Sequence, residues 1–421
     1  MFKAQNIIKP LECFFILVLS AYILFSPFSK VFTKLIFNVA LISWSLLNLA
    51  QLKFGRNGPR VVFLKSLTNK INSFSYSNRF ALIFFASVAL SVILSSNIYN
   101  SQKIFFSRYI PYLLFFLLGF TCSRTKEYFR LFLYAVLMGG IILGLGGVRD
   151  HFYFNQSKLL TSFGFRVNLA LYFVFYMPFC FVALLFSRNK GFKLLALIAT
   201  LILLSCLIWN NARSAIIIAF LVILIATFVK SRRAGLILLM VFLIIAAFAL
   251  PKMFLNIHWL INSVSYTNRI DLWKTSLAIF EDFPIFGAGL GMYEKILYQY
   301  APGGGYSEAF IHLHAHNTYL EIAAEIGLLG ILSFLLIFLV LYRRSRQAFY
   351  RLRTGIFGHE HVVVVGFVLS IFATLLFALV CSIITVGFQD ATMFWFMLGL
   401  TYGLLELITP EVKPTTRDVT A

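Results

Sequence analysis

The chain has 421 residues, of which 60% are hydrophobic and 12% are charged, and its mean hydropathy is +0.88. A soluble domain is about half apolar and about a quarter charged, so one globular core cannot bury this excess. The composition therefore excludes a soluble protein and predicts one solvated largely by a lipid bilayer. The formal net charge of +21 does not favour nucleic-acid binding. The basic residues lie in short clusters between apolar runs, which is typical of loops at a cytoplasmic membrane surface.

The first apolar run follows Lys3 and Lys9 and resembles a secretory signal sequence. It contains no small-residue cleavage site and continues into further apolar segments, so we expect an uncleaved first span. The five cysteines lie in or beside apolar segments without CxxC spacing. We interpret them as small apolar side chains, with no disulfide indicated.

The lengths of the apolar runs predict an all-α polytopic membrane protein. A helix needs about 20 apolar residues to cross the hydrocarbon, and this length gives about twelve transmembrane helices. No internal repeat is visible. The expected spans are 11–28, 33–52, 80–98, 106–122, 129–147, 167–187, 192–210, 213–229, 234–251, 318–342, 362–386 and 390–409.

The distribution of Lys and Arg fixes the expected orientation. With the N-terminus inside, the inner segments carry the larger share of the basic residues, so both termini are expected in the cytoplasm. This divides the chain into helices 1–9 over residues 1–251, a large outer loop over 252–317, helices 10–12 over 318–409, and a cytoplasmic tail over 410–421. The segments 192–210 and 213–229 are expected to form a helical hairpin with its tip outside.

The outer loop carries its own structural pattern. Ile270, Trp273, Leu277 and Phe280 recur at spacings of three and four, which predicts an amphipathic helix that ends before Pro284. The glycine-rich stretch 283–291 is then expected to be a tight turn that returns the chain to the bundle. Its glycine spacing resembles a dinucleotide-binding fingerprint, but it follows no strand, so we reject that interpretation.

Four arginines face outward against the general charge bias: Arg149, Arg166, Arg213 and Arg269. Arg213 lies at membrane depth, where a charge costs about 2.5–3.5 kcal/mol, and at a helix start, where the macrodipole disfavours a cation. A bound anion removes both penalties, so a phosphate clamp is one interpretation. A snorkelling interfacial arginine is the alternative. Arg269, at the start of the loop helix, is also compatible with a surface ion pair to Asp271 or Asp282.

Three histidines precede the tenth span: His312, His314 and His316. In an extended segment they share a face and could converge on a metal ion, although no carboxylate or cysteine completes a ligand set. A general base is the interpretation that we favour for His316. Thr318 and Glu321 predict a capping box, which places His316 just ahead of a helix N-terminus, where neutral imidazole is favoured. Neutral imidazole can accept a proton from a sugar hydroxyl, and Asn317 could orient the ring or the acceptor.

Several motifs together resemble the O-antigen ligase/polymerase family, over roughly residues 205–335. The last two motifs contain Glu321 and Glu325, for which we expect structural roles. The motifs are NARS at 211–214, NRIDLW at 268–273, DFPIFGAG at 282–289, HAHNTYLE at 314–321 and EIGLLG at 325–330.

The resemblance implies an inverting glycosyltransferase of the inner membrane, with no cofactor or metal and with a large periplasmic loop. Such enzymes transfer a glycan from undecaprenyl pyrophosphate to lipid A–core in ligases, or to another carrier-linked unit in polymerases. By motif, Arg213 and Arg269 take the pyrophosphate-binding roles and His316 activates the acceptor. We assign Arg149 and Arg166 to the same pyrophosphate, and His314 with Asn317 to acceptor orientation. A lipid-linked sugar transporter or flippase is the rival from another class, although the polar residues cluster at one interface.

Overall fold

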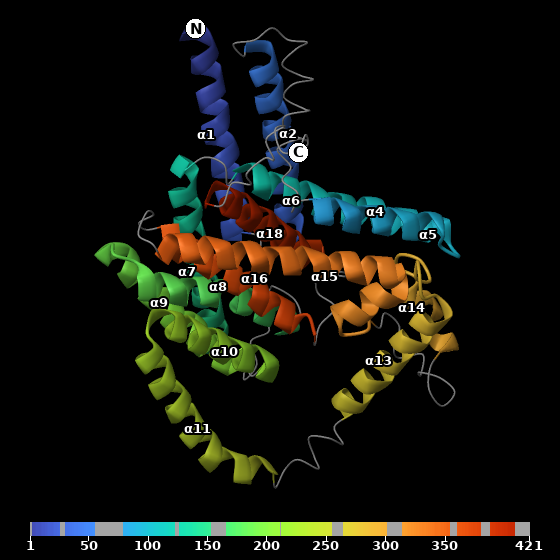
Figure 1. Cartoon of the computed structure of the whole chain (residues 1–421). Helices are drawn as coiled ribbons and strands as arrows, with labels where there is room; N and C mark the ends of the chain where they lie inside the picture. Colours follow the sequence, from blue (N-terminus) through green and yellow to red (C-terminus); the bar gives the residue numbers. More distant parts are fainter. Residues whose placement is uncertain are drawn as a thin grey trace, which may run out of the picture.

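The computed structural model describes residues 2–25, 30–54, 79–122, 126–152, 166–210, 212–254, 264–300, 314–353, 360–379 and 388–408. Within these ranges every regular element is a helix (Figure 1). The elements are α1 (Phe2–Phe25), α2 (Lys30–Phe54), α4 (Arg79–Ile93), α5 (Ile98–Ile104), the π-helix η1 (Phe105–Tyr109), α6 (Ile110–Cys122), α7 (Lys126–Phe152), α8 (Arg166–Phe186), α9 (Lys190–Asn210), α10 (Arg213–Lys230), α11 (Arg232–Phe254), α13 (Val264–Asp282), α14 (Tyr293–Ile296), the 3₁₀-helix η2 (Leu297–Gln299), α15 (Thr318–Arg353), α16 (Glu360–Phe377) and α18 (Phe388–Ile408).

Each of the twelve ranges expected to span the membrane contains a helix over its described residues or most of them. Five stretches of the described chain are long and apolar enough to cross a bilayer: Ile98–Thr121, Leu131–Phe152, Lys190–Asn210, Arg213–Lys230 and Thr318–Arg351. Five further apolar helices are shorter. The chain is therefore an all-α, multi-pass membrane protein, while the number of twelve crossings stays a prediction.

Large apolar side chains cover the outside of several helices. Leu201, Ile217, Ile237 and Met240, on α9, α10 and α11, are each more than half exposed. Leaving one such side chain in water rather than burying it costs about 1.5–3 kcal/mol. Contact with lipid tails removes this cost, so the exposed rows agree with the membrane assignment.

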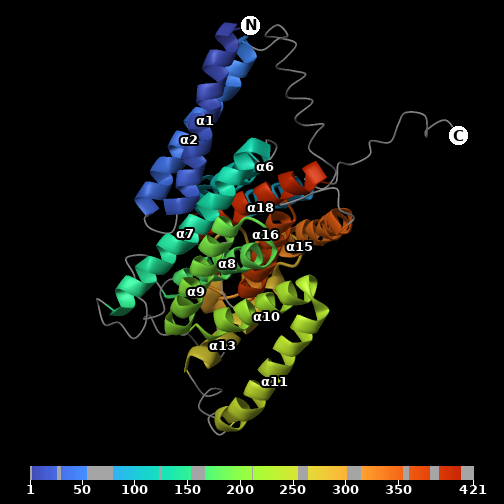
Figure 2. The same cartoon turned by 90° about the vertical axis from the view of Figure 1, so that its left-hand side faces the viewer.

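Helix α18 forms the centre of the bundle, and all its side chains from Ala391 to Leu405 are buried. It crosses α6 at backbone contact, as Figures 1 and 2 show. A Cβ atom on Gly399 would lie 2.0 Å from the Phe116 carbonyl oxygen. This approach, of the kind that small residues permit between membrane helices, draws α6 and α18 together. The Trp395 ring packs on Phe85 at a centroid distance of 5.0 Å.

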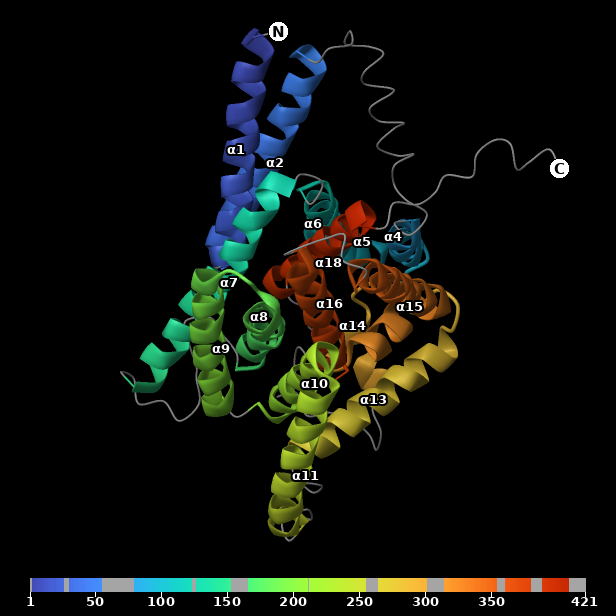
Figure 3. The same ribbon diagram turned by 60° about the vertical axis from the view of Figure 1, so that its left-hand side comes forward.

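Helix α8 lies between α9, α10 and α16, whereas α1 and α2 form a pair that packs on α7 (Figure 3). The expected helices at 192–210 and 213–229 are confirmed as α9 and α10, whereas the hairpin tip stays a prediction because it includes Asn211, which lies outside the described residues. The two helices make few contacts with each other, because each packs mainly on α8.

A loop helix is confirmed at the expected place, as α13, but the predicted face is wrong. The buried side chains are Leu272, Thr275, Ser276 and Ile279, whereas Leu277 of the predicted row is exposed. The helix begins at Val264, and it ends at Asp282, just before Pro284, as predicted. The glycine-rich stretch forms the predicted turn and leads into α14.

Candidate active site

The glycine-rich turn docks into a break in α15. Gly327 adopts φ +74° and ψ −164°, which interrupts the helix one quarter of the way along its length. The turn supplies partners for the backbone groups at this break: the Leu328 N–H donates to the Pro284 carbonyl at 2.8 Å, and the Ala288 N–H donates to the Ala324 carbonyl at 2.9 Å. Since unpaired backbone groups are costly away from water, the turn and the break stabilise each other.

Glycine is required on both sides of this contact. Gly287 has φ +73°, and a Cβ atom there would lie 2.2 Å from the carbonyl carbon of Glu325. A Cβ atom on Gly327 would lie 2.4 Å from the carbonyl carbon of Ile285. The glycine spacing that resembles a nucleotide-binding fingerprint therefore serves the close approach of two backbones.

Glu325 is a buried anchor for the same loop. Its Oε1 accepts a hydrogen bond from the Tyr293 N–H at 3.2 Å, and its carbonyl oxygen accepts one from Ser91 Oγ at 2.6 Å. The Tyr293 hydroxyl in turn donates to the Leu272 carbonyl of α13 at 2.9 Å. These contacts tie α13, α14 and α15 together, which is the structural role expected for Glu325.

His316 lies just before α15 in a left-handed backbone conformation, with φ 49°. It is the one non-glycine residue with positive φ among the residues described by the structure. This conformation costs a non-glycine residue about 1–2 kcal/mol, and such strain clusters at functional sites. The outlier therefore marks His316 independently of the motif around it.

The start of α15 is capped by Asn317, which corrects the predicted capping box. Asn317 Oδ1 accepts hydrogen bonds from the N–H groups of Tyr319, at 3.0 Å, and Leu320, at 3.2 Å. The Glu321 N–H bonds to the Asn317 carbonyl at 3.0 Å, so Thr318 is already inside the helix. The N–H of Thr318 reaches the Ala378 carbonyl beyond α16 at 2.9 Å. Asn317 thus sets the direction in which the chain leaves His316.

The surroundings of His316 favour a neutral imidazole. The pKa of His316 is lowered below its ordinary value, first by burial and second by the positive charge of Arg269. The sequence predicts a neutral ring from the helix N-terminus, whereas burial and Arg269 are the causes found here. Arg269 itself is half-buried in the first turns of α13. The structure therefore brings Arg269 and His316 into one electrostatic environment.

His314 lies beside the same site, with its Nδ1 3.7 Å from Glu321 Oε1. This pair is attractive when the imidazole carries a proton. The described residues contain no group of three or more His, Cys, Asp or Glu side chains arranged to hold a metal ion. His312 lies outside the described residues, so the three-histidine metal site stays untested.

Asp282, a possible partner of Arg269, has another contact. The Tyr300 hydroxyl donates to Asp282 Oδ2 at 2.6 Å, and this hydrogen bond raises the pKa of Tyr300. The contact joins the end of α13 to the residue that follows η2.

Arg213 is the first residue of α10 and is exposed, and Arg166 is the first residue of α8, with its side chain outside the described set. The opposite ends of these helices, at Lys230 and Phe186, line one cavity together with Phe349 near the end of α15. Helices of this length measure about 27–32 Å. The starts of α8 and α10 therefore lie far from that cavity, on the other side of the bundle.

Arg149, near the end of α7, forms an ion pair with Asp150 at 2.8 Å. His151, two residues after Arg149, stacks on Trp209 near the end of α9 at a centroid distance of 4.2 Å. This contact places the end of α7 beside the end of α9, close in sequence to Arg213. Arg149 itself pairs with Asp150, and its side chain is 55% exposed.

Helix α16 links the helix that carries Arg213 to the start of α15, next to His316. It packs on α10, and the turn that follows it bonds to the start of α15 through Ala378 and Thr318. Figures 1 and 3 show the starts of α10 and α13 on the same side of the bundle. Among the described residues, no hydrogen bond joins Arg213 to Arg269 or His316.

The fold and this site define a class: a multi-pass helical membrane protein with a neutral histidine and a guanidinium gathered at the start of a broken helix. Residues 173–335 match the model of the O-antigen ligase family. This part of the chain is therefore similar to O-antigen ligases, which confirms the resemblance seen in the motifs. The match contains Arg213, Arg269, His314, His316 and Asn317. No curated protein matches the chain.

Proposed function

We propose that the protein is an inverting glycosyltransferase that moves a glycan from undecaprenyl pyrophosphate to lipid A–core at the periplasmic face of the inner membrane. The observation that carries this proposal is the neutral His316 beside Arg269, within the region that matches the O-antigen ligase family. A base and a cation in one place are what transfer from a phosphate-linked donor needs. Both termini lie in the cytoplasm in this proposal.

The acceptor hydroxyl loses its proton to the neutral ring of His316, and its oxygen attacks the anomeric carbon of the donor sugar. The new glycosidic bond forms as the bond from that carbon to the phosphate oxygen breaks on the opposite face. Undecaprenyl pyrophosphate leaves with the electron pair, and Arg269 and Arg213 stabilise its charge. The proton on His316 then passes to water.

The remaining residues support these steps. Arg149 and Arg166 extend the positive side of the site toward the pyrophosphate. Asn317 caps α15 and thereby fixes the position of His316, through which it orients the acceptor. His314 contacts the acceptor from the same segment. In this mechanism the guanidinium groups supply the charge stabilisation that a metal ion would otherwise provide.

The test is transfer by the purified protein with a carrier-linked glycan, lipid A–core and EDTA. We expect product at an unchanged rate in the chelator and none with His316→Ala. Loss of transfer in EDTA that zinc restores would contradict the mechanism and return the three histidines to a metal site.

The same assay separates the alternatives. A polymerase would extend a second carrier-linked unit and leave lipid A–core unmodified. A transporter or flippase would move the carrier-linked glycan across a vesicle membrane without forming any new glycosidic bond. The interfacial position of His316 and Arg269, away from the middle of the spans, favours the transferase.

A further inference from the structure

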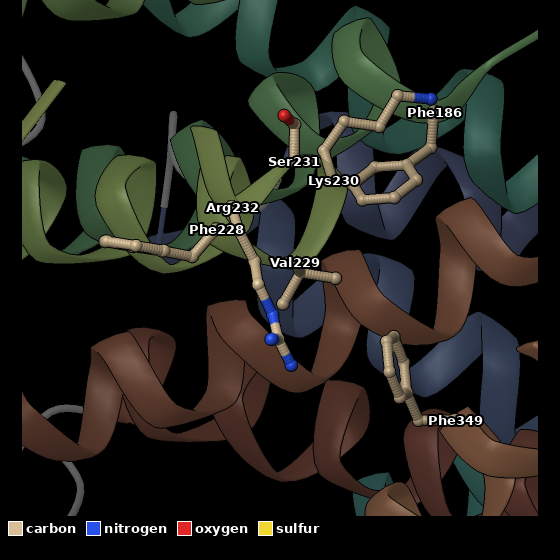
Figure 4. Close-up of a pocket in the computed structure, with 7 residues that line it drawn as sticks. All are labelled: Phe186, Phe228, Val229, Lys230, Ser231, Arg232 and Phe349. Carbon is tan, nitrogen blue, oxygen red and sulfur yellow. The ribbon is translucent and has the colours of Figure 1, made fainter. Parts of the chain in front are cut away.

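A second concave site lies at the far ends of the helices that carry the candidate active site. It is a cavity of about 660 Å³ between the end of α8, the turn from α10 to α11, and the late part of α15 (Figure 4). We name it the basic pocket. Its lining residues are Phe186, Phe228, Val229, Lys230, Ser231, Arg232 and Phe349.

The basic pocket combines two cations with an apolar wall. Lys230 reaches over the ring of Phe186, with Nζ 5.1 Å from the ring centroid, and Arg232 extends toward the wall that carries Phe349 (Figure 4). None of the described residues that line the pocket is a carboxylate. This cation–π contact holds the Lys230 ammonium at the pocket while leaving its N–H groups available to an anion.

The position of Arg232 adds a second argument. It is the first residue of α11, and the first turn of this helix contains no acidic residue. A helix start carries partial positive charge, so the arginine and the helix repel each other unless an anion lies between them. The Ser231 side chain accepts a hydrogen bond from the Ala234 N–H at 3.4 Å, which is a long contact. The helix start is therefore only weakly capped by the chain itself.

We propose that the basic pocket binds an anionic phospholipid, with the headgroup phosphate at Lys230 and Arg232 and the acyl chains along Phe228 and Phe349. Charge complementarity selects an anionic lipid over a zwitterionic one, because the described lining residues offer two positive charges and no negative one. The phenyl rings select a lipid over free phosphate. The inference is independent of the active site, since the pocket lies at the opposite ends of α8 and α10.

The experiment measures binding of dioleoyl phosphatidylglycerol to the purified full chain by native mass spectrometry, with dioleoyl phosphatidylcholine as the comparison lipid. One basic residue near an anionic lipid surface contributes roughly a fivefold change in affinity. We therefore expect Lys230→Gln and Arg232→Gln each to weaken phosphatidylglycerol binding roughly fivefold. We expect Val229→Trp, which fills the pocket and keeps both charges, to weaken it as well.

Lys193→Gln is the matched control, because Lys193 is exposed near the start of α9 and does not line the pocket. It should leave binding unchanged. Equal weakening by Lys193→Gln, or normal binding by Val229→Trp, would reduce the effect to general surface charge and overturn the proposal. Equal binding of both lipids, or full competition by inorganic phosphate, would overturn it too. Glycan transfer is a separate readout, so these outcomes do not depend on the proposed enzyme activity.

Discussion

The contact between the glycine-rich turn and the break in α15 can be tested by Gly287→Ala. The left-handed conformation at this position costs alanine about 1–2 kcal/mol. The new Cβ atom would lie 2.2 Å from the backbone carbon of Glu325, so no rotation of a side chain can relieve the overlap. The turn must then withdraw and lose the hydrogen bonds from the N–H groups of Ala288 and Gly289, each worth about 1 kcal/mol. The total loss is about 3–4 kcal/mol.

The assay is thermal unfolding of the purified protein in detergent, followed by tryptophan fluorescence. Gly287→Ala should lower the unfolding midpoint by several degrees and should also lower glycan transfer. The matched control is Gly191→Ala in the first turn of α9, where the nearest atom to the added Cβ is Asn189 Oδ1 at 3.5 Å. This control should unfold at the wild-type temperature or slightly above it. Equal midpoints for the two variants would show that the turn is not docked against α15, and the reasoning would fail.

Three further predictions concern the charged site. Arg269→Gln removes the second cause of the lowered His316 pKa, so the acidic limb of kcat/KM against pH should move to higher pH. The limb should not reach that of an ordinary histidine, because burial remains. An unmoved limb would show that Arg269 does not influence His316. Asn317→Ala should reduce transfer and cost about 1 kcal/mol of helix capping, whereas Asn317→Asp should retain both in unfolding and activity measurements. Arg213→Ala should lower kcat by about 10²-fold at unchanged thermal stability, whereas Arg188→Ala, an exposed residue between α8 and α9, should not.

The positions of the helices could be predicted because they depend on local composition. An apolar run of sufficient length forms a helix wherever lipid or protein surrounds it, so the ranges around α9 and α10 follow from the sequence. The turn at Pro284 is equally local, since proline restricts and glycine widens the range of backbone conformations whatever their neighbours are. The crossing of α6 and α18 at Gly399 is not local, because a glycine inside an apolar run does not show which helix it contacts.

The break in α15 could not be predicted for the same reason. Gly327 lies in an apolar run that is typical of one continuous helix, and the partner that stabilises the break is Pro284, far away in the sequence. The cap was predicted wrongly because Asn317 and Thr318 are both good N-cap residues. The choice depends on the bond between the Thr318 N–H and Ala378, which exists only in the folded bundle.

The neutral state of His316 shows a related limit. The sequence favours a neutral ring because of the helix start, whereas burial and Arg269 are what lower the His316 pKa in the folded structure. Proximity between the start of α13 and the start of α15 is a tertiary property that neither motif contains. Motif order therefore singled out the candidate residues, whereas the electrostatic effect of Arg269 on His316 depends on the fold.

The docked turn explains how Arg269 and His316 come to lie together. Helix α13 ends where the turn begins, and the first segment of α15 ends where the turn docks, so both helices run toward one anchor. From the anchor back to Arg269 is about 20 Å of helix, and from Gly327 back to the start of α15 is about 14 Å. Both lengths run back from the same anchor, in agreement with the lowering of the His316 pKa by Arg269. The pairing of the guanidinium with the imidazole thus depends on the backbone contact of Gly287 with Glu325, and a change there should separate the two groups without altering either.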